Sequence, residues 1–327
     1  MHFFAGFGIS HLIHVMVIGI DMMGGDYAPA EAIKGIKSYL ETSSPLPVCL
    51  VGDEKQLNPL LEAHRIDSAL VQVQHADEVI GMHEHPTKAL KEKPNSSISV
   101  GFGLLAKNKI DAFISAGNTG AMLVGTHFSI KPLEGVLRPT ISTIIPKRNG
   151  QTGLLLDVGL NADCKPEQLN QFAMMGTVYA KEILGIDNPT TGLINVGEEE
   201  GKGNQLAQAT YPLLKANPQI NFIGNIEGRD ILGEKADVMV CDGFTGNIIL
   251  KMAESIYDIA RSEKINNAYF DRFNFEDYGG TPILGVAKPV IIGHGISGEK
   301  AFVNMLKLAE KMIRKDVMGT LQKAIQS

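Results

Sequence analysis

The feature of this sequence that most constrains the fold is a recurring unit, in which an apolar run leads into a glycine-containing polar turn and then a helical pattern. Its clearest copy is Val238–Glu254. Val238–Cys241 is apolar throughout, as expected of a strand buried on both faces of a parallel sheet. Apolar residues then recur at helical spacing from Ile248 onwards. One such turn alone is commonly just a tight connection. Its recurrence along the chain predicts an α/β fold.

Strands are predicted wherever short apolar runs occur, with helical patterns between them. The predicted strands are 15–20, 47–52, 69–74, 111–115, 140–145, 153–156, 192–196, 221–226, 238–241 and 289–292. The polar turn Lys147–Gly150 between two of these runs indicates a hairpin. No repeat, low-complexity tract or linker divides the chain. We therefore predict a three-layer, Rossmann-like fold with a largely parallel sheet, built as a single domain of one or two lobes over residues 16–327.

Composition narrows the class of protein. The chain has 327 residues and is 44% hydrophobic, which is enough for a substantial core, and its net charge of −6 argues against a general nucleic-acid-binding protein. Its three cysteines show no metal-ligand spacing, which favours a reduced, cytoplasmic chain. The apolar stretch 2–20 lacks a basic start and a cleavage site, so we do not predict a signal or membrane segment. Residues 1–15 are interpreted as an extension or a misassigned start.

Polar turns follow many of the predicted strands. They are Asp21–Asp26, Ser115–Gly120, Asp157–Asn161, Gly197–Asn204, Glu227–Arg229, Asp242–Asn247 and His294–Ser297. In a parallel sheet such turns lie at one edge, where open α/β sheets bind ligands. Small residues, hydrogen-bonding side chains and a few charges suit a substrate that carries phosphate. Neither a dinucleotide fingerprint nor a Walker P-loop sequence is present.

Seven motifs occur in a fixed order: IDMMGGDYAP, SAGNTGAM, LLDVGLNADCKPEQL, GEEEGKGN, CDGFTGN, YGGTPILG and GHGIS. Together they resemble the bacterial acyl-carrier-protein:phosphate acyltransferase family over residues 16 to about 318. The resemblance implies a fold similar to phosphotransacetylases and isocitrate-type dehydrogenases, a homodimer, and no metal or nucleotide cofactor. It also implies that an acyl group passes from acyl carrier protein to inorganic phosphate. The acyl phosphate would then feed a membrane glycerol-3-phosphate acyltransferase in phospholipid synthesis.

This chain departs from the family pattern at three places. Leu160 stands where alanine is usual, and Ile296 stands where serine is usual. The stretch 261–285, and Arg261–Phe275 within it, is shorter than the apolar helical hairpin that family members often carry. Peripheral contact with the inner face of the membrane through this stretch is therefore in question.

Attack of phosphate on a thioester requires positioning, an oxyanion site and charge balance rather than a strong general base. Lys202 and Arg229 are candidates for the positive charge that balances phosphate. The alternative interpretation is that Lys202 is a solvated surface residue and that Arg229 forms a surface salt bridge. His294 is the candidate proton donor to the leaving thiolate, with a merely structural histidine as the alternative.

The turns supply the remaining candidates. Asn247 is predicted to be catalytic, together with Lys202 and His294. The predicted substrate-binding residues are Asp21, Gly24, Gly25, Asn118, Thr119, Gly120, Asn161, Arg229, Asp242, Gly243, Thr245 and Gly246. Among them, the turn that ends at Asn247 offers donors for positioning and for the oxyanion, and Asn118 and Thr119 offer small polar donors.

Other residues are given a structural interpretation. Glu198–Glu200 lack suitably spaced partners for a metal, and His83 and His85 form only a weak metal signal. Cys164 and Cys241 have no histidine nearby in sequence to activate them as nucleophiles. A decarboxylating dehydrogenase of the isocitrate type stays an alternative, although no metal-binding aspartates or adenine site are located. A non-catalytic regulator that binds acyl groups or phosphate is a second alternative.

The last helix offers a candidate docking face for the acidic carrier protein. Its basic residues share one helical face, and they are Lys300, Lys307, Lys311 and Arg314. A solvated basic face with no partner is the competing interpretation.

Overall fold

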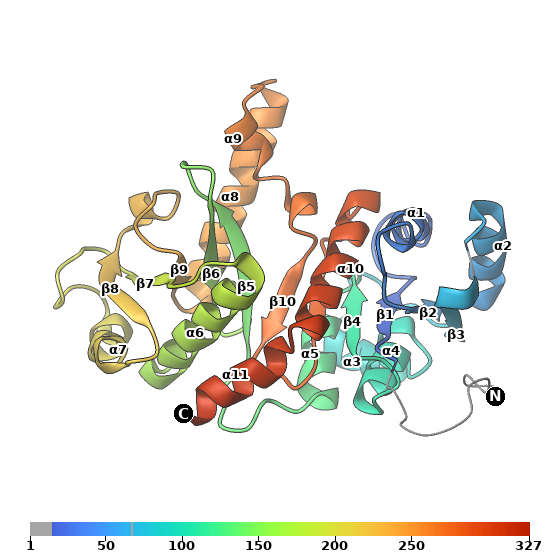
Figure 1. Cartoon of the computed structure of the whole chain (residues 1–327), viewed down its shortest axis with the longest axis horizontal. Helices are drawn as coiled ribbons and strands as arrows, with labels where there is room; N and C mark the ends of the chain where they lie inside the picture. Colours follow the sequence, from blue (N-terminus) through green and yellow to red (C-terminus); the bar gives the residue numbers. More distant parts are fainter. Residues whose placement is uncertain (1–14, 67) are drawn as a thin grey trace.

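The computed structural model describes residues 15–66 and 68–327, so all but one residue of the predicted extension 1–15 lies outside the described part. Within that part, one sheet of eleven strands has the order β3-β2-β1-β4-β11-β10-β5-β6-β9-β7-β8 (Figure 1). The strands are β1 Ile18–Asp21, β2 Val48–Gly52, β3 Val71–His75, β4 Ala112–Ser115, β5 Thr140–Pro146, β6 Thr152–Leu156, β7 Thr190–Ile194, β8 Asn221–Ile226, β9 Val238–Val240, β10 Thr281–Leu284 and β11 Val290–Ile292.

Helices cover both faces of this sheet. They are α1 Ala30–Leu40, α2 Glu54–His64, α3 Pro86–Glu92, α4 Ser97–Ala106, α5 Thr119–Ser129, α6 Pro166–Tyr179, α7 Gln205–Ala216, α8 Gly243–Ser262, α9 Ala268–Asp271, α10 Glu299–Arg314 and α11 Val317–Gln326. Side chains that alternate along a strand enter two separate cores: Leu50 packs in one and Val51 in the other. Helices α1, α6, α7, α10 and α11 contribute to the first core, and α3, α4, α5 and α8 to the second. The predicted three-layer α/β architecture is confirmed.

Three neighbouring strand pairs in the middle of the sheet are antiparallel. β10 pairs antiparallel with both β11 and β5, and β5 pairs antiparallel with β6, as the predicted hairpin requires. The other seven pairings are parallel. Three successive reversals leave β6, β9, β7 and β8 running opposite to β3, β2, β1, β4 and β11.

The expectation that all polar turns share one edge is therefore wrong. The turns after β1, β4 and β11 leave the sheet in one direction, and those after β6, β7, β8 and β9 leave it in the other. The cause is the antiparallel β5–β6 hairpin, because the two antiparallel pairings of β10 leave β5 parallel to β11. No strand had been predicted at β10, which has four residues in the motif YGGTPILG. Its glycines and proline hid a short strand, because both residues are rare inside strands.

A long helix links the two groups of turns. Helix α8 begins with the turn that follows β9, where Asp242 caps its N-terminus by accepting a hydrogen bond from the Thr245 N–H at 2.8 Å. It is 20 residues long, and with α9 it projects from the body of the molecule (Figure 1). Arg272, just after α9, donates hydrogen bonds to the carbonyls of Lys147 and Gln151 in the β5–β6 turn. These contacts fix the start of the segment that returns towards β10.

Candidate active site

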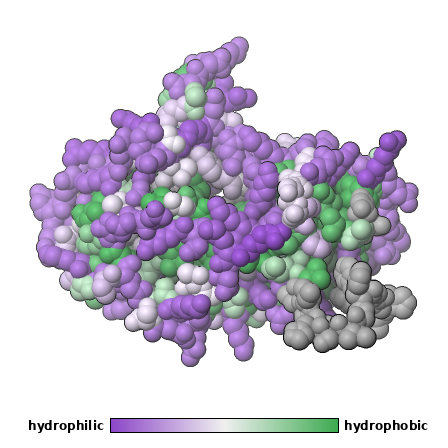
Figure 2. All heavy atoms as spheres, in the orientation of Figure 1, coloured by the Kyte–Doolittle hydropathy of each residue, from purple (hydrophilic) through white to green (hydrophobic). Residues whose placement is uncertain are grey.

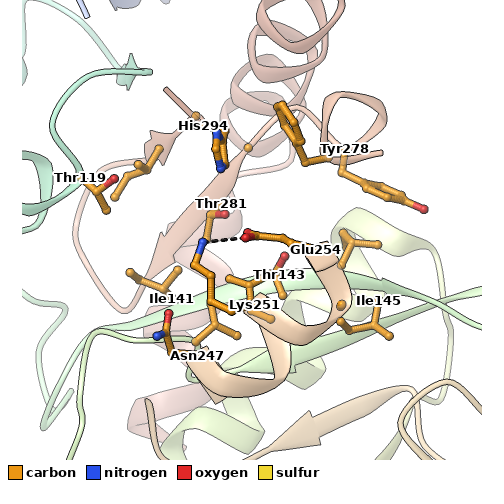
Figure 3. A pocket seen from close by; sticks show the side chains of 18 of the residues that line it. Thr119, Ile141, Thr143, Ile145, Asn247, Lys251, Glu254, Tyr278, Thr281 and His294 are labelled. Atoms are coloured by element: carbon orange, nitrogen blue, oxygen red, sulfur yellow. Dashed lines mark hydrogen bonds and ion pairs between the residues drawn. The ribbon is translucent and has the colours of Figure 1, made fainter. Parts of the chain in front are cut away.

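A cavity of about 420 Å³ lies between α8, β5, the start of β10 and the turn that follows β11 (Figure 3). Much of its wall is apolar, and the apolar residues include Ile141, Ile145, Leu250, Phe273, Phe275 and Ile292. Polar side chains also line it, and they are Thr119, Thr143, Asn247, Lys251, Glu254, Tyr278, Thr281 and His294. A mostly apolar hollow with a few convergent polar groups is the usual form of a small-molecule site.

Three of the predicted site residues line this cavity: Thr119, Asn247 and His294. They come from the two opposed groups of turns, because Thr119 begins the helix after β4, His294 follows β11 and Asn247 lies in the first turns of the helix after β9. Helix α8 thus carries a residue of the second group to the residues of the first.

His294 is an exposed side chain whose ring lies 4.8 Å from the ring of Phe275, centroid to centroid. Its Nδ1 accepts a long hydrogen bond, 3.5 Å, from the backbone N–H of Ile296. A ring nitrogen points towards the middle of the cavity in Figure 3. The site therefore has a nitrogen placed to give a proton or a hydrogen bond to a group in the cavity.

Lys251 and Glu254 lie in the cavity but were not predicted from the sequence. The Lys251 Nζ lies 2.7 Å from a Glu254 carboxylate oxygen. Lys251 follows Asn247 by four residues, which places both on the same side of α8. That spacing was available in the sequence, so the helical pattern that begins at Ile248 was a signal that could have found Lys251.

The predicted residues at the end of β1 hold the two neighbouring turns together. Asp21 is buried and accepts a hydrogen bond from Ser115 Oγ at 2.6 Å and one from the Met23 N–H at 3.0 Å. Burial raises the pKa of Asp21, and these hydrogen bonds oppose that increase. A Cβ on Gly24 would lie 2.6 Å from the Gly117 nitrogen, and Gly25 has a φ of +100°. All three residues lie outside the cavity lining.

Asn118 is buried and its side chain is fully engaged. Its oxygen caps α5 by accepting from the Ala121 N–H at 2.9 Å. Its nitrogen lies within hydrogen-bonding distance of the carbonyls of Gly81, Met82 and Glu84. Asn118 therefore holds the loop that brings Met82 to the cavity beside Thr119. Gly120 allows Pro86 to approach, because a Cβ there would lie 2.4 Å from the proline ring.

The turns after β6 and β9 interlock through polar groups that are mostly half-buried. Asn161 donates its side-chain N–H to Asp157 and to the Pro139 carbonyl, each at 2.8 Å. Its carbonyl accepts from the Gly243 N–H at 2.7 Å. Thr245 uses its hydroxyl to donate to Asp242 at 3.0 Å. These contacts fix the start of α8, and hence the place at which Asn247 enters the cavity.

Lys202 and Arg229 lie outside the cavity lining. Lys202 is exposed in the loop between β7 and α7, where its carbonyl accepts a hydrogen bond from Asn195. Arg229, in a short turn after β8, forms an ion pair with Glu227 at 2.7 Å and has a side chain that is 73% exposed. The role of both as phosphate ligands stays a prediction.

Comparison with known proteins places this chain in a family. Residues 16–265 match the family described as "Fatty acid synthesis protein". The chain is 44% identical over 322 residues to a phosphate acyltransferase of Dictyoglomus turgidum, covering 92% of this chain and 95% of that protein. It is 45% identical over 320 residues to a phosphate acyltransferase of Aquifex aeolicus, with 91% and 94% covered. The chain belongs to the phosphate acyltransferase family.

Solved structures of other enzymes share the fold of this phosphate acyltransferase family member. A phosphotransacetylase from Streptococcus pyogenes superimposes with a TM-score of 0.63 at 18% identity, covering 95% of this chain and 94% of that chain. The EutD phosphotransacetylase from Staphylococcus aureus gives a TM-score of 0.62 at 15% identity, with 91% and 94% covered. At such low identity the likeness concerns the fold alone.

Helix α10 of this acyltransferase-family chain carries the predicted docking residues, and it offers less free positive charge than the sequence suggested. Lys300 forms an ion pair with Asp277, and the Lys311 ammonium donates to the Ile183 carbonyl at 2.6 Å. Arg314 contacts Glu310 and the Ser44 carbonyl. Three of the four predicted docking residues are thus engaged within the chain. The carrier-protein docking face stays a prediction.

Cys241 is buried and Cys164 is half-buried, which favours the structural interpretation given to them. Burial raises the pKa of Cys164 to about 12 and raises that of Cys241 well above its usual range. Such thiols are poor nucleophiles near neutral pH. Within residues 15–66 and 68–327, no group of His, Cys, Asp and Glu side chains has the arrangement of a metal site. In the same part of the chain, no helix combines the length and the apolar character needed to cross a membrane.

Proposed function

We propose that this chain transfers an acyl group from acyl carrier protein to inorganic phosphate, releasing acyl phosphate and free carrier protein. The observation that carries this proposal is the cavity itself, in which an apolar wall suited to an acyl chain adjoins a polar group that includes Asn247, Lys251 and His294. Membership of the phosphate acyltransferase family supports the same reaction. It favours neither a dehydrogenase nor a non-catalytic regulator. The predicted relation of the fold to isocitrate-type dehydrogenases stays a prediction.

The reaction balances with the groups present. An oxygen of hydrogen phosphate attacks the thioester carbonyl, the new C–O bond forms and the C–S bond breaks. The Asn247 side chain has two N–H donors, and one of them serves the oxyanion of the tetrahedral intermediate. The proton that hydrogen phosphate loses passes to the His294 ring, and the imidazolium so formed gives a proton to the leaving sulfur. The products are therefore acyl phosphate and a free thiol.

A direct test uses acyl carrier protein thioester with and without phosphate. Free thiol is measured, and acyl phosphate is trapped with hydroxylamine. We expect thiol release that depends on phosphate and matches the trapped acyl group in amount. Thiol release without phosphate would indicate a hydrolase and contradict the proposal, as would no release at all.

We also propose that the chain works as a homodimer paired through α8. Large apolar side chains are exposed along this helix, and they are Phe244, Ile248, Met252 and Ile259. Their spacing places them on one side of the helix, next to the side that faces the cavity. Apolar residues are visible on the projecting segment in Figure 2. A contiguous apolar helix face of this kind commonly marks an interface between proteins.

Met252→Glu is expected to weaken this dimer, because it places a charge in the middle of the apolar face. Molar mass from light scattering should fall from two chains towards one. Phe128→Glu provides the control, since Phe128 is 75% exposed on α5, away from the proposed interface. A Met252→Glu protein with the wild-type mass would place the interface elsewhere.

The remaining predictions concern the cell. We propose that the acyl phosphate passes to a membrane glycerol-3-phosphate acyltransferase, because a mixed anhydride is an activated acyl donor suited to such a step. A cytoplasmic location, with peripheral contact at the inner face of the membrane, stays a prediction. So does the shortening of the segment 261–285, which forms the end of α8, α9 and the return to β10.

A further inference from the structure

We propose that Lys251 and Asn247 together bind inorganic phosphate, and that Glu254 is an internal anion that competes with phosphate for the Lys251 ammonium. This inference rests on the proposed function, since it assigns the phosphate subsite of that reaction. It places phosphate inside the cavity rather than at the exposed turns of Lys202 and Arg229.

Charge is the first argument for this subsite. Phosphate at neutral pH carries up to two negative charges, so its binding site needs a cationic donor. Among the described residues that line the cavity, Lys251 is the one lysine or arginine. Its side chain is 58% exposed, which leaves its N–H donors accessible to a ligand. A lysine ammonium carries three such donors, and Glu254 uses one of them.

Geometry is the second argument. Asn247 and Lys251 are separated by one helical turn and line the same cavity, so an anion held between them contacts both. Within the described residues, the Asn247 side chain has no hydrogen-bond partner, in contrast to Asn118 and Asn161. Thr143 and Thr281, which carry hydroxyl groups, line the same cavity. The subsite thus combines one cation with neutral donors.

The position relative to His294 is the third argument. Lys251 belongs to α8, whereas His294 belongs to the turn after β11, and both line the cavity. A thioester carbonyl placed between them would meet the nucleophile from the α8 side and the proton donor from the β11 side. Binding of the attacking phosphate is thereby assigned to α8, and protonation of the leaving sulfur is assigned to the turn after β11.

Glu254 places a carboxylate beside the proposed phosphate subsite, and the negative charge of that carboxylate opposes phosphate binding. Its oxygen lies 2.7 Å from the Lys251 ammonium, so a phosphate dianion has to share or displace this ion pair. Removing the carboxylate charge should therefore improve phosphate binding. A lysine that served only to stabilise α8 through an i,i+3 pair would not produce this effect.

The test measures the KM for phosphate and that for acyl carrier protein thioester in matched variants. Lys251→Gln should raise the KM for phosphate by about 10- to 100-fold, as expected for loss of one hydrogen bond to a charged group. The KM for the thioester should stay close to wild type, and Lys251→Arg should restore part of the loss. Glu254→Gln should lower the KM for phosphate by roughly two- to five-fold, the range of a partly exposed ion pair.

Two comparisons keep this test specific. Arg261→Gln removes a cation from the same helix outside the cavity lining and should leave both KM values unchanged. In the double variant, Glu254→Gln should no longer lower the KM, because Lys251 is absent. A Lys251→Gln enzyme with the wild-type KM for phosphate would overturn the inference, as would a Glu254→Gln enzyme with a raised one.

Calorimetry with inorganic phosphate alone separates this inference from the proposed function. Phosphate binding that Lys251→Gln weakens would support the subsite even if no acyl transfer were detected. Phosphate-dependent thiol release together with unchanged phosphate binding in Lys251→Gln would retain the function and reject the subsite.

Discussion

Replacing His294 by glutamine is expected to lower kcat for acyl carrier protein thioester by about 10²- to 10⁴-fold, the range for loss of a general acid. Glutamine keeps a hydrogen-bonding side chain but cannot release a proton. The KM for phosphate should change little, because the proposed phosphate subsite lies on α8. Steady-state kinetics with varied phosphate checks both parts of this prediction.

The leaving group provides the control for this variant. An aryl thioester releases a thiolate of low basicity, which departs without a proton. The defect of His294→Gln should therefore shrink with an aryl thioester and persist with an alkyl one. An equal loss with both donors, or a lowered Tm, would show that His294 acts on the fold through its contacts with Phe275 and the turn Ile296–Ser297.

Gly246→Ala should destabilise the fold by about 3 kcal/mol, at the upper end for overpacked positions. A Cβ at Gly246 would lie 1.8 Å from the Asp157 carbonyl oxygen, and this neighbour is backbone that cannot rotate away. Gly246 was predicted to bind substrate, and on that prediction a side chain would act by blocking the approach of a ligand to the backbone. The structure supplies a different reason, because the close approach is between two turns of the protein itself.

Thermal unfolding of Gly246→Ala tests that reason. Gly103→Ala is the matched control, because Gly103 lies in α4 and a Cβ there meets nothing within 4 Å. We expect the control to be stabilised by about 0.4–1 kcal/mol, because alanine restricts the unfolded chain. A Gly246→Ala protein with the wild-type Tm but no turnover would favour the ligand explanation.

The sequence predicted the individual elements better than their assembly. Every predicted strand is present, since short apolar runs bounded by turns mark buried strands well. β10 was missed because Gly279, Gly280 and Pro282 obscure a strand of four residues. The β5–β6 hairpin reverses the second half of the sheet, and β10 joins the two halves by pairing with both β11 and β5. Local patterns carry no information about such long-range pairing.

The candidate site was predicted in part for the same reason. Turns with Asn, Thr and Gly were predicted to bind substrate, yet many of their polar atoms bond to other parts of the chain, as Asn118 and Asp21 illustrate. A sequence cannot distinguish a donor aimed at a ligand from one that holds a neighbouring loop. Lys251 and Glu254 were missed because they lie within α8, beyond the polar turn Asp242–Asn247 from which the candidates were taken.

The central claim is that acyl chain and phosphate meet in the cavity beside α8. A crystal structure with inorganic phosphate and a non-hydrolysable acyl-pantetheine amide tests it most directly. We predict phosphate in contact with Lys251 and Asn247, and the acyl chain along Ile141, Ile145 and Phe273. Phosphate bound at the turns of Lys202 and Arg229, with the acyl chain outside the cavity, would contradict the account.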